Sequence, residues 1–257
     1  MRAGRHGATI PPVPESPNSQ PASSRRARFV RGVRLGAPIF LGYVPVGTAF
    51  GIIASGLGFT IFQSFMCSAT ALAGAGQFIA LSVMKTGEGL FAVLAATTIV
   101  NLRYVLFGAT LSPYLKGLTW PTQAVLAFTL TDETFAVNIG DRRQGLSSAA
   151  SMAGVGAIAW IGWVAGTVLG AGAAAWIGDP SRWGVDFAMP AMFTALFVAL
   201  AEDRRHVLVG LVAGAVALLV PALATVGLSI PDAWTIVVAS MLSATAGTLF
   251  FREEERP

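Results

Sequence analysis

Charged residues are scarce in this 257-residue sequence. Only 12% of the residues are charged and 54% are hydrophobic, whereas a soluble domain carries about 25% charged residues. A soluble fold of this size would need charged side chains on every outward helix face. The composition therefore excludes an ordinary soluble protein and predicts an all-α, polytopic membrane protein. The 29 glycines agree with this class, because small residues let helices approach closely in lipid.

Residues for metal binding and nucleophilic catalysis are also few. The one cysteine, Cys67, lies inside an apolar run, so no internal disulfide can form. His6 lies in a polar N-terminal stretch and His206 at a loop edge, so neither predicts a metal site. No phosphate-binding loop or nucleophile–base pairing is present, which argues against an ATP-driven motor. We expect no enzyme activity, no cofactor and no metal.

A net charge of +4 would suggest nucleic-acid binding in a soluble protein. Here arginines gather just before the first apolar segment, where they predict a cytoplasmic anchor facing anionic lipid rather than a nucleic-acid site. These are Arg25, Arg26, Arg28, Arg31 and Arg34. We expect residues 1–33 to form a disordered basic cytoplasmic tail, 34–251 a single transmembrane transport domain, and 252–257 a short charged cytoplasmic tail.

About eight apolar stretches are long enough to cross the roughly 30 Å of hydrocarbon in a bilayer. They cover 36–58, 60–84, 89–113, 120–140, 149–177, 184–201, 206–228 and 232–251. This count places both termini in the cytoplasm and most loop cations inside, as expected for an inner-membrane protein. The inside positions are Lys85, Arg142, Arg143, Arg204, Arg205, Arg252 and Arg256, and the outside ones are Lys116 and Arg182. A seven-span arrangement would need one re-entrant segment.

Ionisable and amide residues inside these stretches are the candidate functional residues. Asn101 and Arg103 lie within the third stretch, and Asp132 and Glu133 lie near the middle of the fourth. At 1.5 Å per residue, Arg103 and the two acids reach similar depths, so we expect Arg103 to reach one carboxylate. A charge inside a bilayer usually faces a cavity or a partner. The cluster predicts substrate or proton handling; the alternative is a permanent salt bridge that only fixes helix packing.

Two glycine-rich segments are further candidates. Pro45, with Gly47 and Gly51, predicts a discontinuous first helix whose freed carbonyls assist binding; the alternative is a kink with close packing at the glycines. In the second stretch, Gly74, Gly76 and Gln77 predict either an unwound segment near a ligand or a close helix crossing.

These motifs together resemble the AzlC family, the large subunits of branched-chain amino-acid exporters. Five matching stretches occur in order between about residue 30 and residue 250. They are PVGTAFG (Pro45–Gly51), AGAGQF (Ala73–Phe78), NLRYVLFGATLSP (Asn101–Pro113), LTDETFA (Leu130–Ala136) and MPAMF (Met189–Phe193). Members carry Asp or Asn at the position of Asn101, so a proton-binding acid is missing there and the role shifts toward Asp132 or Glu133.

The resemblance implies export of hydrophobic amino acids together with a small membrane subunit of the AzlD type. Arg103 would bind the substrate carboxylate, and Asp132 or Glu133 its ammonium group. The apolar side chain would lie against Phe50, Phe78 or Phe135. We expect coupling to protons through a midplane carboxylate. The alternatives are a channel-like facilitator for a small polar solute or ion, and a purely structural subunit.

Overall fold

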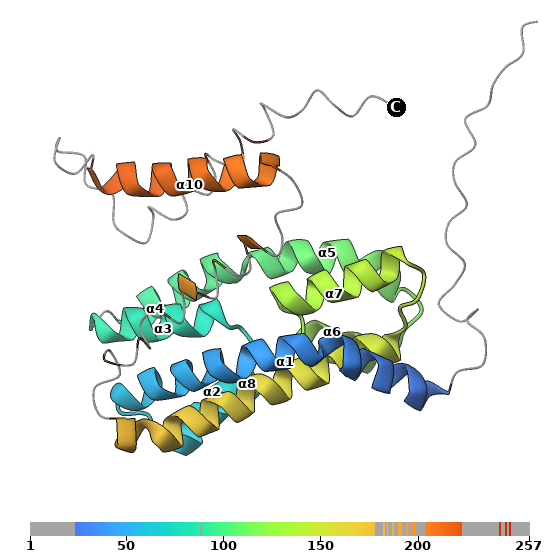
Figure 1. The fold of residues 1–257 in the computed structure, drawn as a ribbon, viewed down its shortest axis with the longest axis horizontal. Coiled ribbons are helices and arrows are strands. Elements are labelled where there is room, and N and C mark those ends of the chain that lie inside the picture. The colour runs from blue at the N-terminus through green and yellow to red at the C-terminus, as the bar shows by residue number, and fades with distance from the viewer. Residues whose placement is uncertain are drawn as a thin grey trace, which may run out of the picture. The chain divides into compact units, whose positions relative to one another are not determined.

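The computed structural model describes residues 24–177 except Glu88, isolated positions from 182 to 198, the helix 204–222, and positions 242, 245 and 247. All regular structure within these residues is helical, which confirms the all-α class. The chain divides into two compact units, Met1–Val185 and Asp186–Pro257. The helices of the first unit are α1 (Arg25–Gly56), α2 (Ile61–Thr70), α3 (Ala75–Lys85), α4 (Leu90–Asn101), α5 (Arg103–Leu115), α6 (Trp120–Phe128), α7 (Asp132–Arg143) and α8 (Ala149–Ile177), and α10 (Arg204–Ala222) lies in the second (Figure 1).

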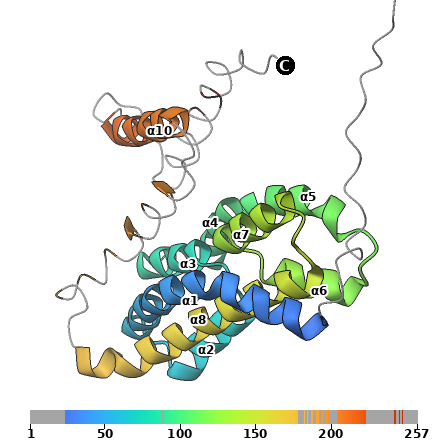
Figure 2. The same ribbon diagram turned by 45° about the vertical axis from the view of Figure 1, so that its right-hand side comes forward.

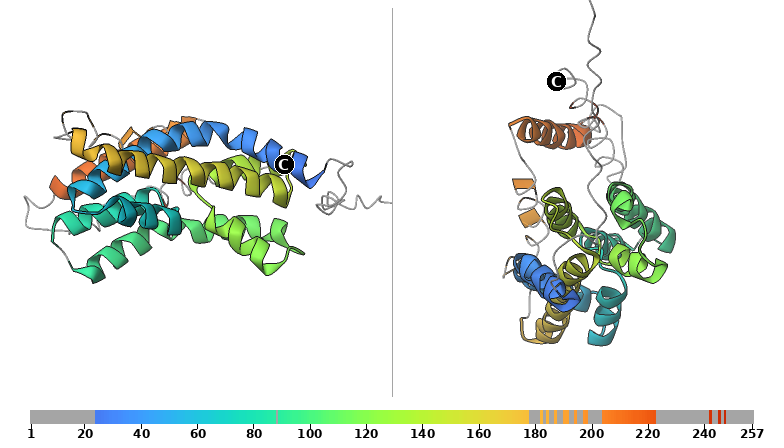
Figure 3. Two further views of the ribbon diagram at one scale, coloured as in Figure 1. Left: turned by 90° about the horizontal axis from the view of Figure 1, so that it is seen from below. Right: turned by 90° about the vertical axis from the view of Figure 1, so that its right-hand side faces the viewer.

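The two longest helices, α1 and α8, lie side by side along their lengths (Figures 1 and 3). Glycines on both helices leave no room for a side chain between them. A Cβ added at Gly51 would lie 2.1 Å from the Thr167 carbonyl oxygen, and one at Gly166 would lie 2.4 Å from that of Val44. Such close backbone approach is the usual packing of small residues in membrane helices.

The glycine contacts also give the direction of the two helices. Gly32 meets Ser151, Gly36 meets Val155 and Gly51 meets Thr167, so the contacts advance together along both chains. Helices α1 and α8 are therefore parallel. Each is long and apolar enough to cross a membrane, and together they form the frame on which the shorter helices pack.

Helices α2 and α3 form a hairpin that reaches only the middle of this frame. Trp160 Nε1 donates to the Ala69 carbonyl oxygen at 3.1 Å, so α2 ends opposite the centre of α8. The chain then turns back, as a contact between the two arms shows: the Gln77 amide of α3 donates to Ser68 Oγ of α2 at 3.4 Å. With 10 and 11 residues, each arm is about 15 Å long and spans about half of the hydrocarbon.

Helices α4 and α5 make one crossing with a turn in its middle. The segment Leu90–Leu115 is long and apolar enough to span a membrane, and the helix is interrupted only at Leu102. Gly76, at the start of α3, packs against the Asn101 side chain at the end of α4. The α4/α5 turn therefore lies at the depth of the first hairpin tip.

Helices α6 and α7 form a second hairpin, entering from the other side. Three contacts in sequence order show that α7 runs parallel to α5. Arg103 pairs with Asp132 at 3.0 Å, Phe107 stacks on Phe135 with 4.4 Å between ring centroids, and Arg142 donates to the Tyr114 carbonyl oxygen at 3.2 Å. Since α5 leads away from the centre, α7 also returns to the side where α5 ends.

That side is the one where α1 begins. Arg31 of α1 forms an ion pair with two hydrogen bonds to Asp141 near the end of α7, and donates to the Leu146 carbonyl oxygen at 3.1 Å. The loop carrying Lys116 therefore lies on the side of the α1 N-terminus, and the loop carrying Lys85 lies on the opposite side. The predicted eight crossings place both lysines the other way round.

The predicted crossings 60–84 and 120–140 are therefore wrong in their course, although both segments are helical. Composition cannot separate a crossing from a hairpin of two half-length helices, because both are about 20 apolar residues long. Among the described helices, three segments are long and apolar enough to span: Arg25–Gly56, Leu90–Leu115 and Ala149–Ile177. The stretches 184–201 and 232–251 lie outside the continuously described residues, so the total number of spans stays a prediction.

The two hairpins belong to a repeated pattern. Helix α1 ends at Gly56 and is followed by a hairpin from Ile61, and α5 ends at Leu115 and is followed by a hairpin from Trp120. The two helix ends are 59 residues apart, and so are the two hairpin starts. The second copy has the opposite orientation because α4/α5 runs antiparallel to α1. A crossing plus a hairpin, repeated upside down, is an inverted-topology repeat of the kind found in secondary transporters.

Two further expectations differ from the structure. Helix α1 is continuous through Pro38 and Pro45, so the predicted discontinuity of the first span is wrong. Both prolines lie on the exposed side of α1, away from α8, where the ring needs no space between helices. The helix also begins at Arg25, within the predicted tail, because Ser24 Oγ accepts from the Ala27 N–H as an N-cap.

Candidate functional site

Three breaks in the helices gather near the centre of the first unit. They lie at Ala71–Gly74 between α2 and α3, at Leu102 between α4 and α5, and at Thr129–Thr131 between α6 and α7. In Figure 2, α3 lies beside α4, and α7 lies beside α5, where Arg103 meets Asp132 and Phe107 stacks on Phe135. The Tyr104 hydroxyl at the α5 start lies 3.5 Å from the Ala73 carbonyl oxygen of the first hairpin tip. We use the name central cluster for the candidate residues at and next to these breaks: Gly74, Gly76, Gln77, Asn101, Arg103, Asp132 and Glu133.

Arg103 and Asp132 form the charged pair of the central cluster. Arg103 Nη2 lies 3.0 Å from Asp132 Oδ2, and the side chains are 25% and 12% exposed. The Arg103 guanidinium also lies over the ring of Tyr104, 5.3 Å from its centroid. Arg103 Nε is buried without a hydrogen-bond partner. The expected contact between Arg103 and a carboxylate is thus present, and the Nε donor of Arg103 has no hydrogen-bond acceptor.

The local sequence explains why the acids stand at the second hairpin tip. Thr131 caps α7: its hydroxyl accepts from the Thr134 N–H at 3.2 Å, while Thr134 Oγ1 accepts from the Thr131 N–H at 2.8 Å. Asp132 and Glu133 follow in the first turn, where the helix dipole favours negative charge. Thr134 Oγ1 also donates to the Thr129 carbonyl oxygen at 2.9 Å, which satisfies one backbone group of the break.

Glu133 is held differently from Asp132. The Tyr43 hydroxyl of α1 lies 2.5 Å from Glu133 Oε2 and 2.8 Å from Thr131 Oγ1. Tyr43 is 6% exposed. Tyr43 is not among the residues predicted from the sequence, although a signal is present there. It stands seven residues after Gly36 and four before Gly47, on the glycine-marked face of α1.

The first hairpin tip supplies uncharged polar groups. Gly74 has φ +43°, and as N-cap of α3 it provides no side-chain hydrogen bond. A Cβ at Gly76 would lie 2.8 Å from Asn101 Nδ2, so the Asn101 amide would have to shift to accept any larger residue there. Gln77 Oε1 and Asn101 Oδ1 are both buried without a hydrogen-bond partner. Two acceptors and one guanidinium nitrogen of the central cluster thus remain open to a polar ligand or water.

Aromatic side chains lie on one flank of the central cluster. Trp163 of α8 lies within 5.4 to 6.3 Å, centroid to centroid, of Tyr43, Phe50 and Phe78. Phe50 and Trp163 are fully buried. Of the phenylalanines predicted to face an apolar substrate, Phe50 and Phe78 belong to this group, whereas Phe135 stacks on Phe107.

Three predicted site residues do not enter the central cluster. Gly47 and Gly51 pack against the backbone of α8, at Trp163 and Thr167. Pro45 lies on the exposed side of α1, so its freed carbonyl does not reach the charged pair. The structure brings together the other seven predicted residues: Gly74, Gly76, Gln77, Asn101, Arg103, Asp132 and Glu133.

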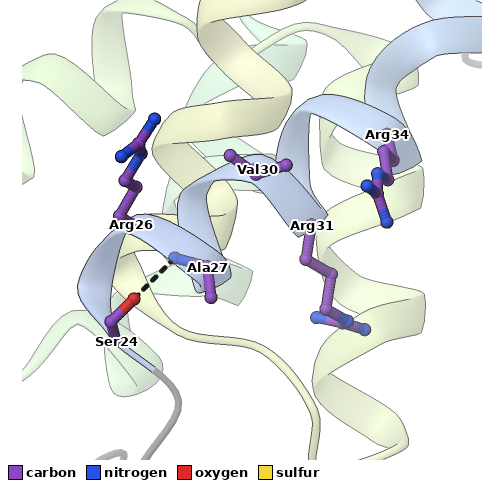
Figure 4. Close-up of a pocket in the computed structure, with 6 residues that line it drawn as sticks. All are labelled: Ser24, Arg26, Ala27, Val30, Arg31 and Arg34. Atoms are coloured by element: carbon purple, nitrogen blue, oxygen red, sulfur yellow. Dashed lines mark hydrogen bonds between the residues drawn. The ribbon is translucent and has the colours of Figure 1, made fainter.

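An open concavity occurs elsewhere, at the N-terminus of α1. It is lined by Ser24, Arg26, Ala27, Val30, Arg31 and Arg34 (Figure 4). In the close-up, Arg31 and Arg34 point to the same side of the helix and Arg26 points away from them. Arg31 is engaged by Asp141, so the concavity is part of the basic end of α1 and is separate from the central cluster.

Comparison with known proteins identifies the family. The profile described as "AzlC protein" matches residues 38–177, more than half of the sequence. This chain belongs to the AzlC family. In this AzlC family member the matched region runs from within α1 to the end of α8, so it includes both hairpins and the whole central cluster.

Relatives of this AzlC family member are membrane proteins. The inner membrane protein YgaZ of Escherichia coli (strain K12) is 32% identical over 218 residues, covering 80% of this chain and 89% of the relative. An uncharacterized membrane protein of Archaeoglobus fulgidus is 30% identical over 200 residues, covering 76% and 85%. The branched-chain amino acid transport protein AzlC of Bacillus subtilis (strain 168) is 26% identical over 171 residues, covering 66% of each. No solved structure matches this chain.

The family and its named members identify a membrane transport protein and suggest that it is not an enzyme. The described residues contain no group of three His, Cys, Asp or Glu side chains that could hold a metal ion.

Proposed function

We propose that the chain is a secondary transporter that exports branched-chain or other hydrophobic amino acids across the cell (inner) membrane, driven by the proton gradient. The observation that carries this proposal is the meeting of two half-length hairpins, from opposite sides, at the Arg103–Asp132 pair. Inverted hairpins with helix ends at mid-depth are the usual way in which secondary transporters build a substrate site. The name of the Bacillus subtilis relative, a branched-chain amino acid transport protein, supports the substrate class.

The central cluster suits a zwitterion with an apolar side chain. Arg103 can bind a carboxylate with two hydrogen bonds, and Asp132 can bind an ammonium group. An arriving amino acid would exchange the internal Arg103–Asp132 pair for two pairs with itself, so no charge is left alone. The open acceptors on Gln77 and Asn101 can accept further ammonium hydrogens. Phe50, Phe78 and Trp163 provide apolar surface on the same flank.

Proton coupling rests on the two neighbouring acids. One carboxylate, Asp132, is neutralised by Arg103, and the other, Glu133, is bound by a phenol. A carboxylate inside a bilayer without a countercharge favours its protonated form. One acid can therefore serve the substrate while the other carries a proton as access alternates between the two sides.

We further propose that the α1 N-terminus faces the cytoplasm and that both chain termini lie there. Cytoplasmic loops of membrane proteins are enriched in Lys and Arg. The α1 side holds Arg25, Arg26, Arg28, Arg31, Arg34, Lys116, Arg142 and Arg143; the opposite side holds Lys85, and Arg182 follows α8 after its end on that side. Compared with eight simple crossings, the hairpins exchange Lys85 with Lys116, so the excess of cations on the α1 side is equally strong.

A small AzlD-type membrane subunit completes the proposed transporter. In the segment Leu90–Leu115, none of the most apolar 18-residue window is buried by the described part of this chain. Phe91, Val105 and Leu106 are among its exposed side chains. Among the described residues nothing covers this face, and a second apolar helix packed on it would complete a two-chain transporter.

Exchange of labelled leucine in proteoliposomes holding the chain and its co-expressed small subunit tests the proposal. We expect saturable counterflow with unlabelled leucine, competition by isoleucine and valine, and stimulation by an imposed pH gradient. Non-saturating flux without counterflow would instead favour a channel-like facilitator and would contradict an alternating site. Resistance of expressing cells to toxic branched-chain analogues tests the direction of transport independently.

A further inference from the structure

We infer that Glu133 is the proton-carrying carboxylate of the transporter and that Tyr43, on α1, is the positioning residue that keeps it usable in both protonation states. This rests on the proposed proton-coupled transport and adds the division of labour between the two acids. The starting point is that Asp132 and Glu133 are neighbours in sequence yet have partners of different chemistry: a guanidinium for Asp132 and a phenol for Glu133.

Asp132 is poorly placed to carry the proton. Its carboxylate pairs with Arg103 at 3.0 Å, and protonating it would leave a partly buried guanidinium facing a neutral acid. Arg103 already has one buried nitrogen without a partner. Removing one charge of such a pair costs more than removing both, because the remaining charge is then uncompensated. Asp132 is therefore better suited to exchange Arg103 for a substrate ammonium.

Glu133 has no cation of this kind. Within the described residues, no Lys or Arg nitrogen lies within 4 Å of its carboxylate. Its hydrogen-bond partner is the Tyr43 hydroxyl at 2.5 Å. The other titratable groups around it are Asp132 beside it on α7, and Arg103 and Tyr104 on α5; α8 contributes the uncharged Trp163, edge-on to Tyr43.

The Tyr43 hydroxyl can serve either form of Glu133. When Glu133 is ionised, Tyr43 donates to Oε2 and accepts from Thr131 Oγ1. When Glu133 is protonated, the carboxyl donates to Tyr43, and Tyr43 donates to Thr131 Oγ1 at 2.8 Å. Thr131 then turns its own hydrogen to Thr134 Oγ1 at 3.3 Å. Each hydroxyl has one hydrogen and two lone pairs, so every group stays bonded while no heavy atom moves.

Thr131 also connects this chain of hydroxyls to the hairpin. Its oxygen is the N-cap acceptor of α7 and lies at the break where the second hairpin turns. The proton on Glu133 is thus connected to α1 through Tyr43 and to the hairpin tip through Thr131. A shift of the tip relative to α1 would break the Tyr43–Glu133 bond, which ties protonation of Glu133 to the position of the hairpin.

The test is the pH profile of leucine counterflow for Tyr43→Phe, with Tyr114→Phe as the matched control. Phenylalanine keeps the ring against Trp163 and removes only the hydroxyl. Hydrogen bonds to a charged group are the stronger ones, so the ionised form loses more, and we expect the midpoint to move to higher pH by about half a unit to one unit. Tyr114 lies beside Arg142 at the end of α5 that is far from the central cluster, so its variant should keep the wild-type midpoint.

A double variant separates a positioning role from a packing role. In Glu133→Gln the pH midpoint should disappear, and adding Tyr43→Phe should change the profile no further. An equal shift by Tyr43→Phe with and without Glu133, or an unchanged midpoint in Tyr43→Phe, would overturn the inference. Absence of leucine counterflow in the wild type would instead contradict the proposed function, so the two failures are distinguishable. Folding of each variant is checked by its thermal unfolding in detergent.

Discussion

The Arg103–Asp132 pair allows a direct choice between a substrate site and a structural salt bridge. The variants are Arg103→Gln, Asp132→Asn and the combination of both. Breaking a buried pair by removing one partner costs about 3–5 kcal/mol of folding free energy. Arg103 is 25% exposed, so solvent screens part of this and we expect about 2–3 kcal/mol for each single variant. The double variant has no unpaired charge and should recover to within about 1 kcal/mol of the wild type.

Stability and transport should then separate. If Arg103 and Asp132 bind the two charged groups of an amino acid, the double variant folds well yet loses a charged hydrogen-bonding pair to the substrate. At about 1.5–3 kcal/mol for a hydrogen bond to a charged group, the apparent affinity should fall about 10-fold to 150-fold. The measurements are thermal unfolding in detergent and the concentration dependence of leucine counterflow. Wild-type affinity in the double variant would refute the substrate-site reasoning and leave only a structural pair.

Three further outcomes follow from the packing and the hairpin tips. Gly166→Ala should destabilise the protein, because its Cβ would lie 2.4 Å from the Val44 carbonyl oxygen. Gly172→Ala has no neighbour within 4 Å and should raise the free energy of unfolding by up to about 1 kcal/mol. Thermal unfolding compares the two variants. Gly74→Ala, at φ +43°, should cost about 1–3 kcal/mol of backbone strain at the first hairpin tip and lower counterflow more than Gly42→Ala, which has open space around it. Arg31→Gln should leave the buried Asp141 carboxylate without its guanidinium and lower the unfolding temperature more than Arg34→Gln does.

Sequence alone predicted the class of the protein well, because lipid imposes a composition that few soluble folds share. It also predicted the pairing of Arg103 with a carboxylate, since two charges at similar depth in neighbouring helices have few other partners. The course of the chain was harder. A half-length hairpin and a full crossing both need about 20 apolar residues. Contacts between helices distinguish them, among them those of Gln77 with Ser68 and of Arg142 with Tyr114.

Loop charge could not correct this error. Moving Lys85 and Lys116 to opposite sides leaves the cationic excess on the α1 side, because the N-terminal arginines dominate the count. The two hairpins exchange sides together, so later loops keep their predicted places. A rule that counts loop charges gives the same result when Lys85 and Lys116 are both assigned to the wrong side, because the two errors cancel.

Only part of the candidate site could be predicted from the sequence. Residues that are costly in lipid, such as Arg103, Asp132 and Glu133, stand out in any apolar stretch. Tyr43 did not, because a tyrosine in an apolar helix is ordinary and its role depends on an oxygen 90 residues away. Pro45 stood out for its backbone chemistry, yet α1 accommodates it on the exposed side, where a kink has no partner to contact.

The hairpin course, which brings the two tips to the central cluster, is tested most directly by the accessibility of the two loop lysines. In a Cys67→Ser background, single substitutions Lys85→Cys and Lys116→Cys are labelled with a membrane-impermeant maleimide in intact cells and in inverted vesicles, with Arg26→Cys as the marker of the α1 side. The structure predicts that position 116 reacts from the same side as position 26 and that position 85 reacts from the opposite side. The reverse pattern, with 85 on the side of 26 and 116 opposite, is that of simple crossings and would contradict the hairpins.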